Sequence, residues 1–552
     1  METSFDYIVV GAGSSGCAVA GRLAQAGGVS VALLEAGPSD HSAAVTTPLG
    51  LVLTTGKPGP RNFGFRTQRQ PLLANRRGRQ PRGRGLGGSS SINGMVYMRG
   101  VPRDYDRWAE AGCEGWSWQD VLPYFKRSEC NERNGGRDDE LHGGSGPLNV
   151  ADPRSPSPFS RFFVEAAQAA GYRYNADFNG PTQEGVGCFQ LTQRNGERWN
   201  AARAYLHGGD ANTLSSLPNL HVLTGAQAMR ILFEGTRAVG VQVQRGDDVQ
   251  TLTARREVIV SSGAFGSPQL LMASGIGPAE HLRELGVPVI AASPEVGGNL
   301  QEHVDVLLYQ LKVSGSGLLG PSIRGAWRLF DEWRRYKRER TGMLTGNVAE
   351  AGGFFKSQRD LADPDLQAHF MTAAVTHPMR WGQGYSLHMC VLRPHSRGQL
   401  RLASADTRVA PLIDLNMLSD PRDMDTLVKG VHILKRILDQ PALKRFGGTF
   451  GDPHLRADGS DDEAIRAIIA QRADTAFHPV GTCRMGGDAN SVVDPQLRVR
   501  GVQGLRVVDV SIMPTLIGGN TNAPAMMIGE KAADMILGRV PAVAEARSTI
   551  SA

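Results

Sequence analysis

A histidine and a cysteine stand close together in the segment FHPVGTCRMG, at His478 and Cys483. Such a pair could bind a metal, His478 could be packed in a core, or it could act as a base in catalysis. A zinc site needs three or four converging ligands, and no further pair of suitable residues stands nearby. The spacing therefore speaks against a metal and leaves a structural or a catalytic histidine open.

A glycine-rich turn near the N-terminus follows a short apolar run that is typical of a buried parallel strand. Gly11, Gly13 and Gly16 form a G-x-G-x-x-G pattern, and small and apolar residues of helical character follow. In a dinucleotide site such a turn brings backbone N–H groups and a helix N-terminus to the pyrophosphate. Glu35 ends the next apolar run, about 20 residues on, where a carboxylate binds ribose hydroxyls. We therefore predict a dinucleotide site.

The turn itself does not distinguish NAD from FAD. The fingerprint occurs once, at the N-terminal end, and no second copy follows. An enzyme that passes electrons between a flavin and NAD is expected to carry two. The single fingerprint therefore favours FAD.

Three further segments carry distinctive patterns: GRGLGGSSSINGMVYMRG at residues 83–100, SSGAFGSPQLLMASGIGP at 261–278, and GLRVVDVSIMPTLIGGNTNAPAMMIGEKAADMI at 504–536. Together with FHPVGTCRMG they resemble, in order and over nearly the whole chain, the signatures of the glucose–methanol–choline (GMC) family of flavin oxidoreductases. Within the family, the sequence looks most like bacterial choline-dehydrogenase-like and aliphatic-alcohol dehydrogenases.

The resemblance implies where FAD binds. The N-terminal motif would hold its ADP half, Asp509 and the turn at 520–524 would close over the isoalloxazine, and Ile92 matches a position where some relatives carry a histidine bonded covalently to the flavin. Since isoleucine cannot form that bond, we expect FAD to be non-covalent. The residues expected at the cofactor are Gly11, Gly13, Ser14, Ser15, Gly16, Glu35, Ala36, Gly87, Gly88, Asn93, Gly94, Val96, Ala226, Ala264, Asp509, Asn520, Asn522 and Pro524.

The resemblance also gives His478 the role of base beside the flavin. Alcohol oxidation needs such a base, because an alcohol has a pKa of about 16 and loses its hydride poorly while it keeps its proton. An imidazole with an ordinary pKa near 6.5 is mostly neutral at pH 7 and can accept that proton. The partner position falls on Asn522, whose amide can orient the substrate oxygen but cannot act as a base. Cys483 is then expected to be a packing residue.

The substrate is harder to predict. Met95, Trp381 and Phe477 could line an apolar pocket, while Glu302 and Glu350 stay open as carboxylates for choline's ammonium. We favour an uncharged primary alcohol over choline, and a quinone or another non-NAD acceptor over O2. Two remote alternatives of the same family are a hydroxynitrile lyase and a fatty-acid photodecarboxylase, the latter suggested by Cys390 and Arg393.

The expected fold class is α/β, α+β overall, with a Rossmann-like FAD-binding domain interleaved with a substrate domain of antiparallel sheet and helices. A chain of 552 residues is too long for one ordinary domain. The FAD domain is assigned residues 1–155, 215–305 and 470–540, the substrate domain residues 156–214 and 306–469, and a flexible tail residues 541–552.

Charge and cysteine content limit the partners. A net charge of +6 is mild for this length, and no nucleic-acid-binding module is recognisable. Six scattered cysteines without a C-x-x-C pair predict neither a disulfide framework nor zinc. No signal peptide or membrane-spanning run is apparent, so we expect a cytoplasmic protein.

One segment, residues 323–340, is basic and carries aromatic residues at helical spacing. A helix of this kind can lie in a membrane interface, on the inner face of the cytoplasmic membrane. The alternative, which we favour from the sequence, is a solvated helix that packs its aromatic side on the substrate domain. The sequence leaves both open.

Overall fold

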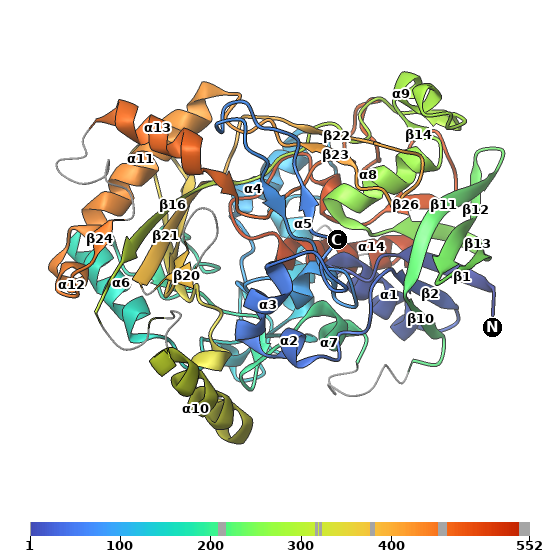
Figure 1. Ribbon diagram of the computed structural model, residues 1–552. Helices are drawn as coiled ribbons and strands as arrows, with labels where there is room; N and C mark the ends of the chain where they lie inside the picture. Colours follow the sequence, from blue (N-terminus) through green and yellow to red (C-terminus); the bar gives the residue numbers. More distant parts are fainter. Residues whose placement is uncertain are drawn as a thin grey trace, which may run out of the picture.

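The computed structural model describes residues 2–539 except 208–216, 315–317, 319–322, 376–380, 383 and 451–460. The predicted tail at 541–552 lies outside the described residues. Two separate sheets lie at opposite ends of the molecule in Figure 1, with loops and helices from several parts of the chain between them. This mixed architecture agrees with the predicted fold class.

The first sheet follows the order β10-β2-β1-β13-β12-β11, with β26 beside β13. Its parallel part pairs β1 with β2 and β13, β2 with β10, and β13 with β26. The runs YIVV and VALLE are apolar except for Glu35 at the end of the second run. This composition suits strands that are buried on both faces. The strands are β1 (Ser4–Val10), β2 (Val31–Glu35), β10 (Leu220–Thr224), β11 (Ala226–Glu234), β12 (Arg237–Arg245), β13 (Asp248–Val260) and β26 (Leu505–Val507).

Three helices belong to this sheet: α1 (Ser14–Ala26), α8 (Gly263–Ala273) and α14 (Asn522–Leu537). Helix α1 packs against β1, β2 and β10, and α14 packs along α1. The hydroxyl of Ser15 donates to the carbonyl of Ala525 at 2.6 Å, so the first turns of these two helices are joined. The N-terminal ends of segments that lie 500 residues apart thus meet at one point.

The second sheet is antiparallel, in the order β24-β16-β21-β18-β17-β7, with β25 beside β16. Helices α6 and α11 pack on it, and α13 packs on β16. The elements are β7 (Gly185–Cys188), β16 (Val304–Leu311), β17 (Ala351–Phe355), β18 (Leu366–Met371), β21 (Gly384–Val391), β24 (Thr449–Phe450), β25 (Asp474–Thr475), α6 (Pro158–Ala169), α11 (Pro421–Leu438) and α13 (Asp462–Arg472).

The two faces of the second sheet differ in character. Side chains alternate along a strand, and the apolar set buried under the helices includes Val306, Phe370 and Met389. Their neighbours in sequence, Leu307 and His388, belong to the opposite face, which borders a cavity. This second face is where the sheet contributes to the site.

The remaining elements are short or lie at the surface. The helices are α2 (Ala43–Thr46), α3 (Leu51–Thr55), α4 (Pro102–Glu110), α5 (Trp118–Ser128), α7 (Ala201–Tyr205), α9 (Ala279–Glu284), α10 (Ile323–Glu339) and α12 (Pro441–Lys444), and the 3-10 turns are η1 (Pro48–Gly50), η2 (Gly88–Ser91), η3 (Glu132–Asn134), η4 (Met343–Thr345) and η6 (Val510–Ile512). The two-stranded pairs are β3 (Phe65–Arg66) with β4 (Arg79–Gln80), β5 (Glu129–Asn131) with β6 (Leu148–Val150), β8 (Gln193–Arg194) with β9 (Glu197–Arg198), β14 (Ile276–Gly277) with β15 (Ala291–Ala292), β19 (Ala374–Val375) with β20 (Trp381–Gly382) and β22 (Gln399–Arg401) with β23 (Leu412–Asp414).

The strand assignments bear on the proposed domain ranges. All strands of the first sheet fall within 1–155, 215–305 and 470–540. In the second sheet β25, at Asp474–Thr475, falls inside a range assigned to the FAD domain, and β16 begins two residues before its assigned boundary at 306. We therefore propose the same interleaved division with β16 and β25 moved to the substrate domain.

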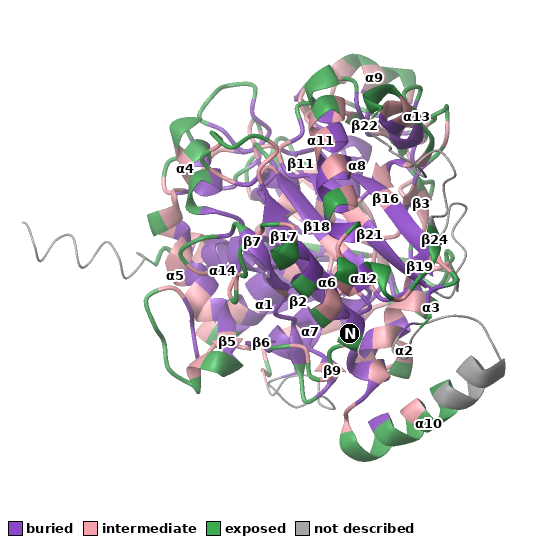
Figure 2. Ribbon diagram, turned by 90° about the vertical axis from the view of Figure 1, so that its left-hand side faces the viewer, coloured by how far each residue is buried: buried purple, intermediate pink, exposed green. Residues whose placement is uncertain are grey.

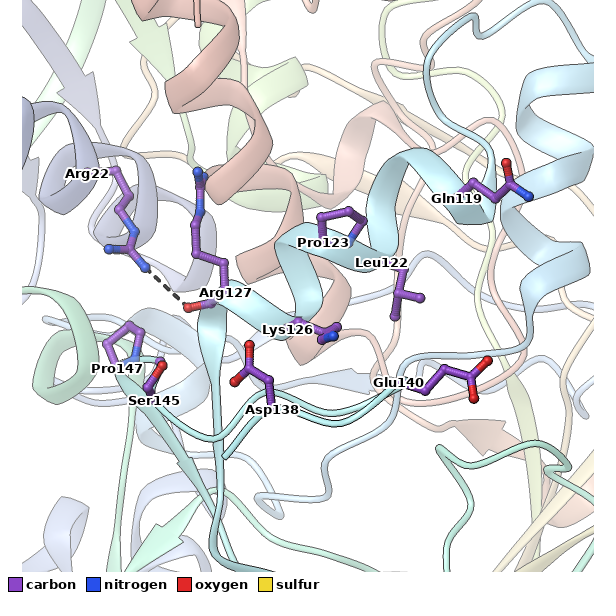
Figure 3. Close-up of a pocket in the computed structure, with 11 residues that line it drawn as sticks. Arg22, Gln119, Leu122, Pro123, Lys126, Arg127, Asp138, Glu140, Ser145 and Pro147 are labelled. Carbon is purple, nitrogen blue, oxygen red and sulfur yellow. Dashed lines mark hydrogen bonds between the residues drawn. The ribbon is translucent and has the colours of Figure 1, made fainter. Parts of the chain in front are cut away.

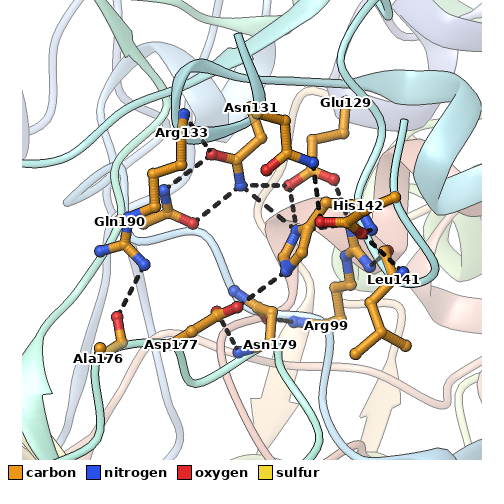
Figure 4. A network of polar contacts seen from close by, with 12 residues as sticks. Arg99, Glu129, Asn131, Arg133, Leu141, His142, Ala176, Asp177, Asn179 and Gln190 are labelled. Carbon is orange, nitrogen blue, oxygen red and sulfur yellow. Dashed lines mark hydrogen bonds and ion pairs between the residues drawn. The ribbon is translucent and has the colours of Figure 1, made fainter. Parts of the chain in front are cut away.

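A buried polar network supports the end of the loop at residues 83–100 (Figure 4). Arg99 forms an ion pair with Glu129, and His142 bridges Glu129 at 3.1 Å and Asp177 at 2.9 Å. The backbone N–H of Arg99 donates to Asn179. Although burial disfavours the charged ring, the hydrogen bonds to Asp177 and Glu129 raise the pKa of His142 to about 9. The network thus fixes a loop that continues into the site.

Helix α10 protrudes from the body, as Figure 2 shows. Tyr336 is buried, and Glu332 accepts a hydrogen bond from the backbone N–H of Met343, so one side of the helix is anchored. Among the described residues, no helix is long and apolar enough to cross a membrane.

Candidate active site

A cavity of about 1820 Å³ extends from the first sheet to the face of the second sheet that the helices do not cover. Most of the residues predicted at the cofactor line it: Gly11, Gly13, Ser14, Ser15, Glu35, Ala36, Gly88, Asn93, Gly94, Val96, Ala226, Ala264, Asp509, Asn520 and Asn522. Met95, Phe477 and His478 line it as well. The structure thus brings the predicted nucleotide residues and the predicted base into one space.

The N-terminal turn is compact because its glycines allow close approach. A Cβ at Gly16 would lie 1.9 Å from the carbonyl oxygen of Gly11, so only glycine permits α1 to start this close to β1. Gly16 itself does not line the cavity. A Cβ at Gly13 would meet only the carbonyl of Ser261, at 3.9 Å, so Gly13 leaves open space beside the helix N-terminus. That space is what a pyrophosphate requires.

Glu35 is buried and holds three loops together. Its carboxylate accepts hydrogen bonds from the backbone N–H groups of Ala12, Gly37 and Gly85, at 3.1, 2.8 and 2.8 Å. Burial raises its pKa, while these N–H groups oppose the rise. A carboxylate has about four acceptor positions, so one remains for a ribose hydroxyl in the cavity.

The second glycine loop lies directly against the first. Gly87 adopts a positive φ of 84°, and its N–H donates to the carbonyl of Ala12 at 2.8 Å. A Cβ at Gly88, whose φ is 53°, would lie 2.7 Å from the Cα of Gly13. Gly87 therefore acts in the turn and does not line the cavity, whereas Ile92 does line it.

The asparagine beside His478 is Asn520 and not Asn522, which corrects the sequence-based assignment. The side-chain amide nitrogen of Asn520 lies 3.1 Å from Nε2 of His478, and its oxygen accepts from Gln367 at 3.0 Å. The side-chain oxygen of Asn522 accepts from the hydroxyl of Ser14 at 2.7 Å. Because Asn522 opens α14, its side chain turns toward α1 and the nucleotide turn, whereas Asn520 precedes the helix and faces the second sheet.

His478 has a second histidine behind it. Nδ1 of His478 lies 3.0 Å from Nδ1 of His303, and Nε2 of His303 lies 3.1 Å from the carbonyl oxygens of Leu392 and Ile517. Carbonyl oxygens only accept, so this Nε2 carries a proton. Burial lowers the pKa of His303 to about 3, so the ring is neutral and its Nδ1 is an acceptor. We therefore assign the proton of His478 to Nδ1, which leaves its Nε2 unprotonated.

The protonation state of His478 follows from its surroundings. Burial, with smaller contributions from His303, His369 and Arg82, lowers its pKa well below 6.5. The ring is thus neutral at pH 7 and keeps an unprotonated Nε2 toward the cavity and Asn520. A neutral imidazole with a free ring nitrogen can accept a proton from a hydroxyl group.

The backbone around His478 is held on both sides. Its N–H donates to the carboxylate of Glu302 at 2.6 Å, and the preceding carbonyl, of Phe477, accepts from Arg82 at 2.8 Å. Phe477 adopts a positive φ of 69°, which is uncommon for a side chain of this size and needs such support. Burial raises the pKa of Glu302 to about 7, although Arg82 opposes the rise.

Several other predicted residues lie elsewhere. Glu302 is buried behind the His478 loop, and Glu350 accepts from the N–H of Ser157, so neither lines the cavity as an ammonium site would. Cys390 is buried in a small apolar cluster and Arg393 pairs with Asp104, so they do not meet at the cavity either. These placements give no support to Glu302 and Glu350 as ammonium ligands, or to Cys390 and Arg393 as a pair at the cavity.

Four more predictions concern packing and the pocket. Cys483 is fully buried, as a packing residue would be, and Pro524 is buried in the first turn of α14 without lining the cavity. Asp509 accepts from the hydroxyl of Ser267 and from the N–H of Gly263, so it fixes the start of α8. Trp381 belongs to β20, and its side chain lies outside the described residues.

The sequence analysis missed the polar side chains that the second sheet contributes. His369 and His388 are directly paired across β18 and β21, and both line the cavity with Asp305 of β16. His303 precedes β16 immediately. The signal for these residues is the alternation of β16, in which His303, Asp305 and Leu307 share one face, but the partners on β18 and β21 depend on strand register.

A second, smaller cavity of about 740 Å³ lies by α5 (Figure 3). Figure 3 shows Arg22 donating to the carbonyl of Arg127, and both arginines also pair with Glu530. None of the residues predicted for catalysis or for the cofactor lines it.

The lining of the large cavity fits FAD. Its first-sheet end offers the open space at Gly13 and an acceptor at Glu35. Nearer to His478, the amide nitrogen of Asn522 is a buried donor without a partner among the described residues. A buried donor of this kind is expected to find an acceptor, and the phosphates and ring carbonyls of FAD are acceptors.

Comparison with known proteins supports the same conclusion. The GMC oxidoreductase N-terminal domain matches residues 5–305 and the C-terminal domain of the same description matches residues 394–529. The chain is 45% identical over 551 residues to an alcohol dehydrogenase [acceptor] of Pseudomonas putida, with 97% of this chain and 96% of that protein covered. It is 40% identical over 542 residues to an oxygen-dependent choline dehydrogenase of Brucella anthropi, with 97% and 96% covered.

Solved structures with a similar fold include a pyridoxine 4-oxidase from Mesorbium loti, with a TM-score of 0.85 and 28% identity over 97% of this chain and all of that one. A fungal aryl-alcohol oxidase gives a TM-score of 0.84 with 25% identity, and the match covers 98% of this chain and 99% of the other. These matches span both sheets and the cavity between them. The chain therefore belongs to the GMC oxidoreductase family and is an oxidoreductase with FAD as its cofactor.

Proposed function

We propose that the enzyme oxidises an uncharged primary alcohol to the aldehyde, with His478 as the proton acceptor. FAD, when bound, accepts the hydride from the carbinol carbon. The observation that carries the proposal is the unprotonated Nε2 of His478, which is set by the contact with His303 and faces the cavity beside Asn520.

The protein's part in the reaction is to remove the hydroxyl proton and hold the oxygen. An alcohol has a pKa of about 16, so its oxygen would gain positive charge if the hydride left before the proton. His478 Nε2 accepts that proton while Nδ1 stays hydrogen-bonded to His303. The amide nitrogen of Asn520, held through Gln367, donates to Nε2 of His478 in the structure, and its second N–H can donate to the substrate oxygen. Asparagine cannot accept the proton, so one histidine carries the acid–base work.

We further propose that FAD is bound without a covalent link. Ile92 lines the cavity in the second glycine loop, and its side chain has no atom that can bond to the flavin. Denaturation in acid should release all FAD into the supernatant after the protein is pelleted. Yellow colour that stays with the pellet would contradict this.

For the electron acceptor we propose a quinone at the inner face of the cytoplasmic membrane, reached through α10. Leu329, Phe330 and Trp333 are 46, 51 and 49% exposed, so about half of each residue is open to solvent. Basic residues lie beside them: Arg334, Arg335, Lys337 and Arg338. Exposed aromatic residues flanked by positive charge match an anionic lipid surface.

Vesicle flotation tests this contact. The wild type is expected to float with vesicles that contain anionic lipid and to stay below with neutral vesicles. The double variant Phe330→Ser, Trp333→Ser should not float, whereas Leu53→Ser, which removes another exposed apolar residue, should behave as the wild type. Equal recovery of all three proteins below the anionic vesicles would contradict the docking proposal.

Three candidates within the family compete with this function. An oxidase would use O2, and a choline dehydrogenase would act on a cation; the named relatives include both a dehydrogenase with an acceptor and an oxygen-dependent choline dehydrogenase. A hydroxynitrile lyase would leave the flavin oxidised. For choline, Glu302 and Glu350 do not line the cavity, but two other carboxylates, Asp305 and Asp474, do.

Anaerobic mixing of the FAD-loaded enzyme with a panel of alcohols tests the proposal. Uncharged primary alcohols should bleach the flavin band, and quinone analogues should restore it faster than O2 does. Absence of bleaching with every alcohol would contradict the proposed reaction. Fast reoxidation by O2 with release of H2O2 would make the enzyme an oxidase.

A further inference from the structure

Two histidines and an aspartate converge from distant parts of the chain. Asp40 and His41 lie in the loop after β2, and His207 follows α7. One ligand atom of each residue lies within 4.8 Å of those of the other two. Among the described residues, this is the only group of three side chains that could bind one metal ion together. The fold thus places two imidazoles and a carboxylate around a single point.

The group has the dimensions of a coordination site. Nε2 of His207 lies 3.0 Å from Oδ1 of Asp40. Zinc binds imidazole nitrogen and carboxylate oxygen at about 2.0–2.2 Å, so two ligand atoms on one ion lie about 3 Å apart. Asp40 and His207 are buried, whereas His41 is exposed, and its ring lies edge to face with that of His207 at 5.4 Å. An exposed ring can turn, so a small rotation brings in the third ligand.

The carboxylate of Asp40 is oriented and charged. The side-chain nitrogen of Asn200 donates to Oδ2 of Asp40 at 3.2 Å, while Oδ1 faces His207. Although burial opposes it, the hydrogen bond from His207 lowers the pKa of Asp40. Metal ligands are commonly held by hydrogen bonds from neighbouring residues in this way. Arg61 also interacts with Asp40, and its positive charge limits the affinity for a cation.

Other contacts between a histidine and a carboxylate lack this convergence. His432 lies 2.7 Å from Asp462 at the surface, but no third ligand joins them among the described residues. His142 contacts Glu129 through Nδ1 and Asp177 through Nε2, so the two carboxylates lie on different sides of the ring. A single ion cannot bind both carboxylates and one nitrogen of that ring.

We propose that Asp40, His41 and His207 bind a divalent transition-metal ion such as Zn²⁺. Two imidazoles and a carboxylate suit such ions, whereas Mg²⁺ and Ca²⁺ prefer oxygen ligands. A carboxylate only accepts, so Nε2 of His207 carries a proton in the contact with Asp40, and the ion takes the place of that proton. Water completes the coordination. The inference goes beyond the proposed function and is independent of the alcohol and of the electron acceptor.

The site is connected to the second glycine loop through Asn200. The side-chain nitrogen of Asn200 lies 2.8 Å from Oγ of Ser91 as well as near Asp40. Ser91 belongs to η2, and Gly88 of the same turn lies so close to Gly13 that a Cβ would clash with it. An ion that fixes Asp40 therefore stiffens the loops around the cofactor, and we expect it to slow the release of FAD.

Calorimetric titration of the FAD-loaded enzyme with Zn²⁺, after removal of metals by a chelator, tests the site. The wild type should bind one equivalent of Zn²⁺ that His41→Ala binds at least about tenfold more weakly. His41→Ala removes an exposed side chain outside the catalytic machinery, so the fold should be kept. His432→Ala, which removes another histidine beside an aspartate, is the matched control and should bind as the wild type does. An excess of Mg²⁺ should not displace the Zn²⁺.

The rate of FAD release, followed by flavin fluorescence, measures the connection to the cofactor. Zn²⁺ should slow the release severalfold in the wild type and leave it unchanged in His41→Ala. No binding of Zn²⁺ by the wild type, or equal affinity of the wild type and His41→Ala, would overturn the site. Bound Zn²⁺ without any change in the rate of FAD release would overturn the connection.

Discussion

The two ends of the large cavity are built in different ways. At the first sheet, the glycine-rich turn leaves open space beside the N-terminus of α1 at Gly13, and the second glycine loop packs closely against this turn at Gly88. At the second sheet, side chains from separate strands converge, as His369 and His388 do across β18 and β21. Backbone groups can hold a cofactor that many enzymes share, whereas a particular substrate has to be recognised by side chains. His478 lies between these two parts of the cavity.

The largest effects are expected from substitutions at the end of the cavity next to the first sheet, where the backbone forms the site. Gly16→Ala would place a Cβ 1.9 Å from the carbonyl of Gly11, so α1 must move away from β1 and the pyrophosphate position with it. We expect loss of FAD. We also expect the unfolding free energy of the cofactor-free protein to fall by about 1–3 kcal/mol, which lowers its melting temperature. FAD content after desalting and thermal unfolding measure the two effects.

The matched variant Gly13→Ala separates ligand binding from packing. Its Cβ has room within the protein, 3.9 Å from the nearest atom, but it fills space beside the helix N-terminus. It should weaken FAD binding while the cofactor-free protein melts as the wild type does. If Gly16→Ala keeps its FAD and its melting temperature, this account of the turn is wrong.

Substitutions of Asn520 and Asn522 test where the cofactor end of the cavity meets the substrate end. Asn520→Ala should keep FAD and lower the rate of flavin reduction by about 10- to 100-fold, because the donor to the substrate oxygen is lost. Asn522→Ala should instead weaken FAD binding, with a nearly unchanged rate in the molecules that stay loaded. Rapid-mixing kinetics on samples of known FAD content distinguish the two variants, and the reverse pattern would restore Asn522 as the partner of His478.

The difference between the ends also explains what the sequence could predict. Gly11, Gly13 and Glu35 were recognisable because their function depends on a continuous stretch of backbone with fixed spacing. The family resemblance added His478 and the turn at 520–524, but the partner position beside the histidine was assigned to Asn522, whereas the structure places Asn520 there. Which asparagine lies there depends on where α14 begins: Asn522 lies in its first turn and faces Ser14, while Asn520 lies before it.

Residues of the second sheet could not be predicted in the same way. His303 and Asp305 lie far in sequence from His369 and His388, and only the pairing of β16, β18 and β21 places them on one face. A shift of one residue in any of these strands would turn the side chains to the helix-covered face. The same limit applies to Glu302 and Glu350, whose positions behind the cavity wall no local pattern indicates.

The smallest expected effect on catalysis concerns the support of His478, where the change is one of stability. Burial raises the pKa of Glu302 to about 7 from 4.5, so the folded protein keeps a proton that the unfolded chain loses between these values. Its contribution to stability is therefore present below pH 4.5 and is lost as pH rises toward 7, by up to about 3 kcal/mol. Glu302→Gln keeps the acceptor for the N–H of His478 and should be more stable than the wild type at pH 8, with the gain disappearing at pH 5. Thermal unfolding at the two pH values measures it, and an equal difference at both would contradict the assignment.

The most direct test of the central claim is the rate of flavin reduction by alcohol in His478→Ala, measured anaerobically on enzyme loaded with FAD. The account predicts normal FAD binding and a rate lower by about 10²- to 10⁴-fold, because the proton acceptor beside Asn520 is removed. In the wild type the rate should stay constant as pH falls to 6.5 and decline only well below it, since the pKa of His478 is lowered. Reduction of the His478→Ala flavin at a rate near that of the wild type would contradict the account.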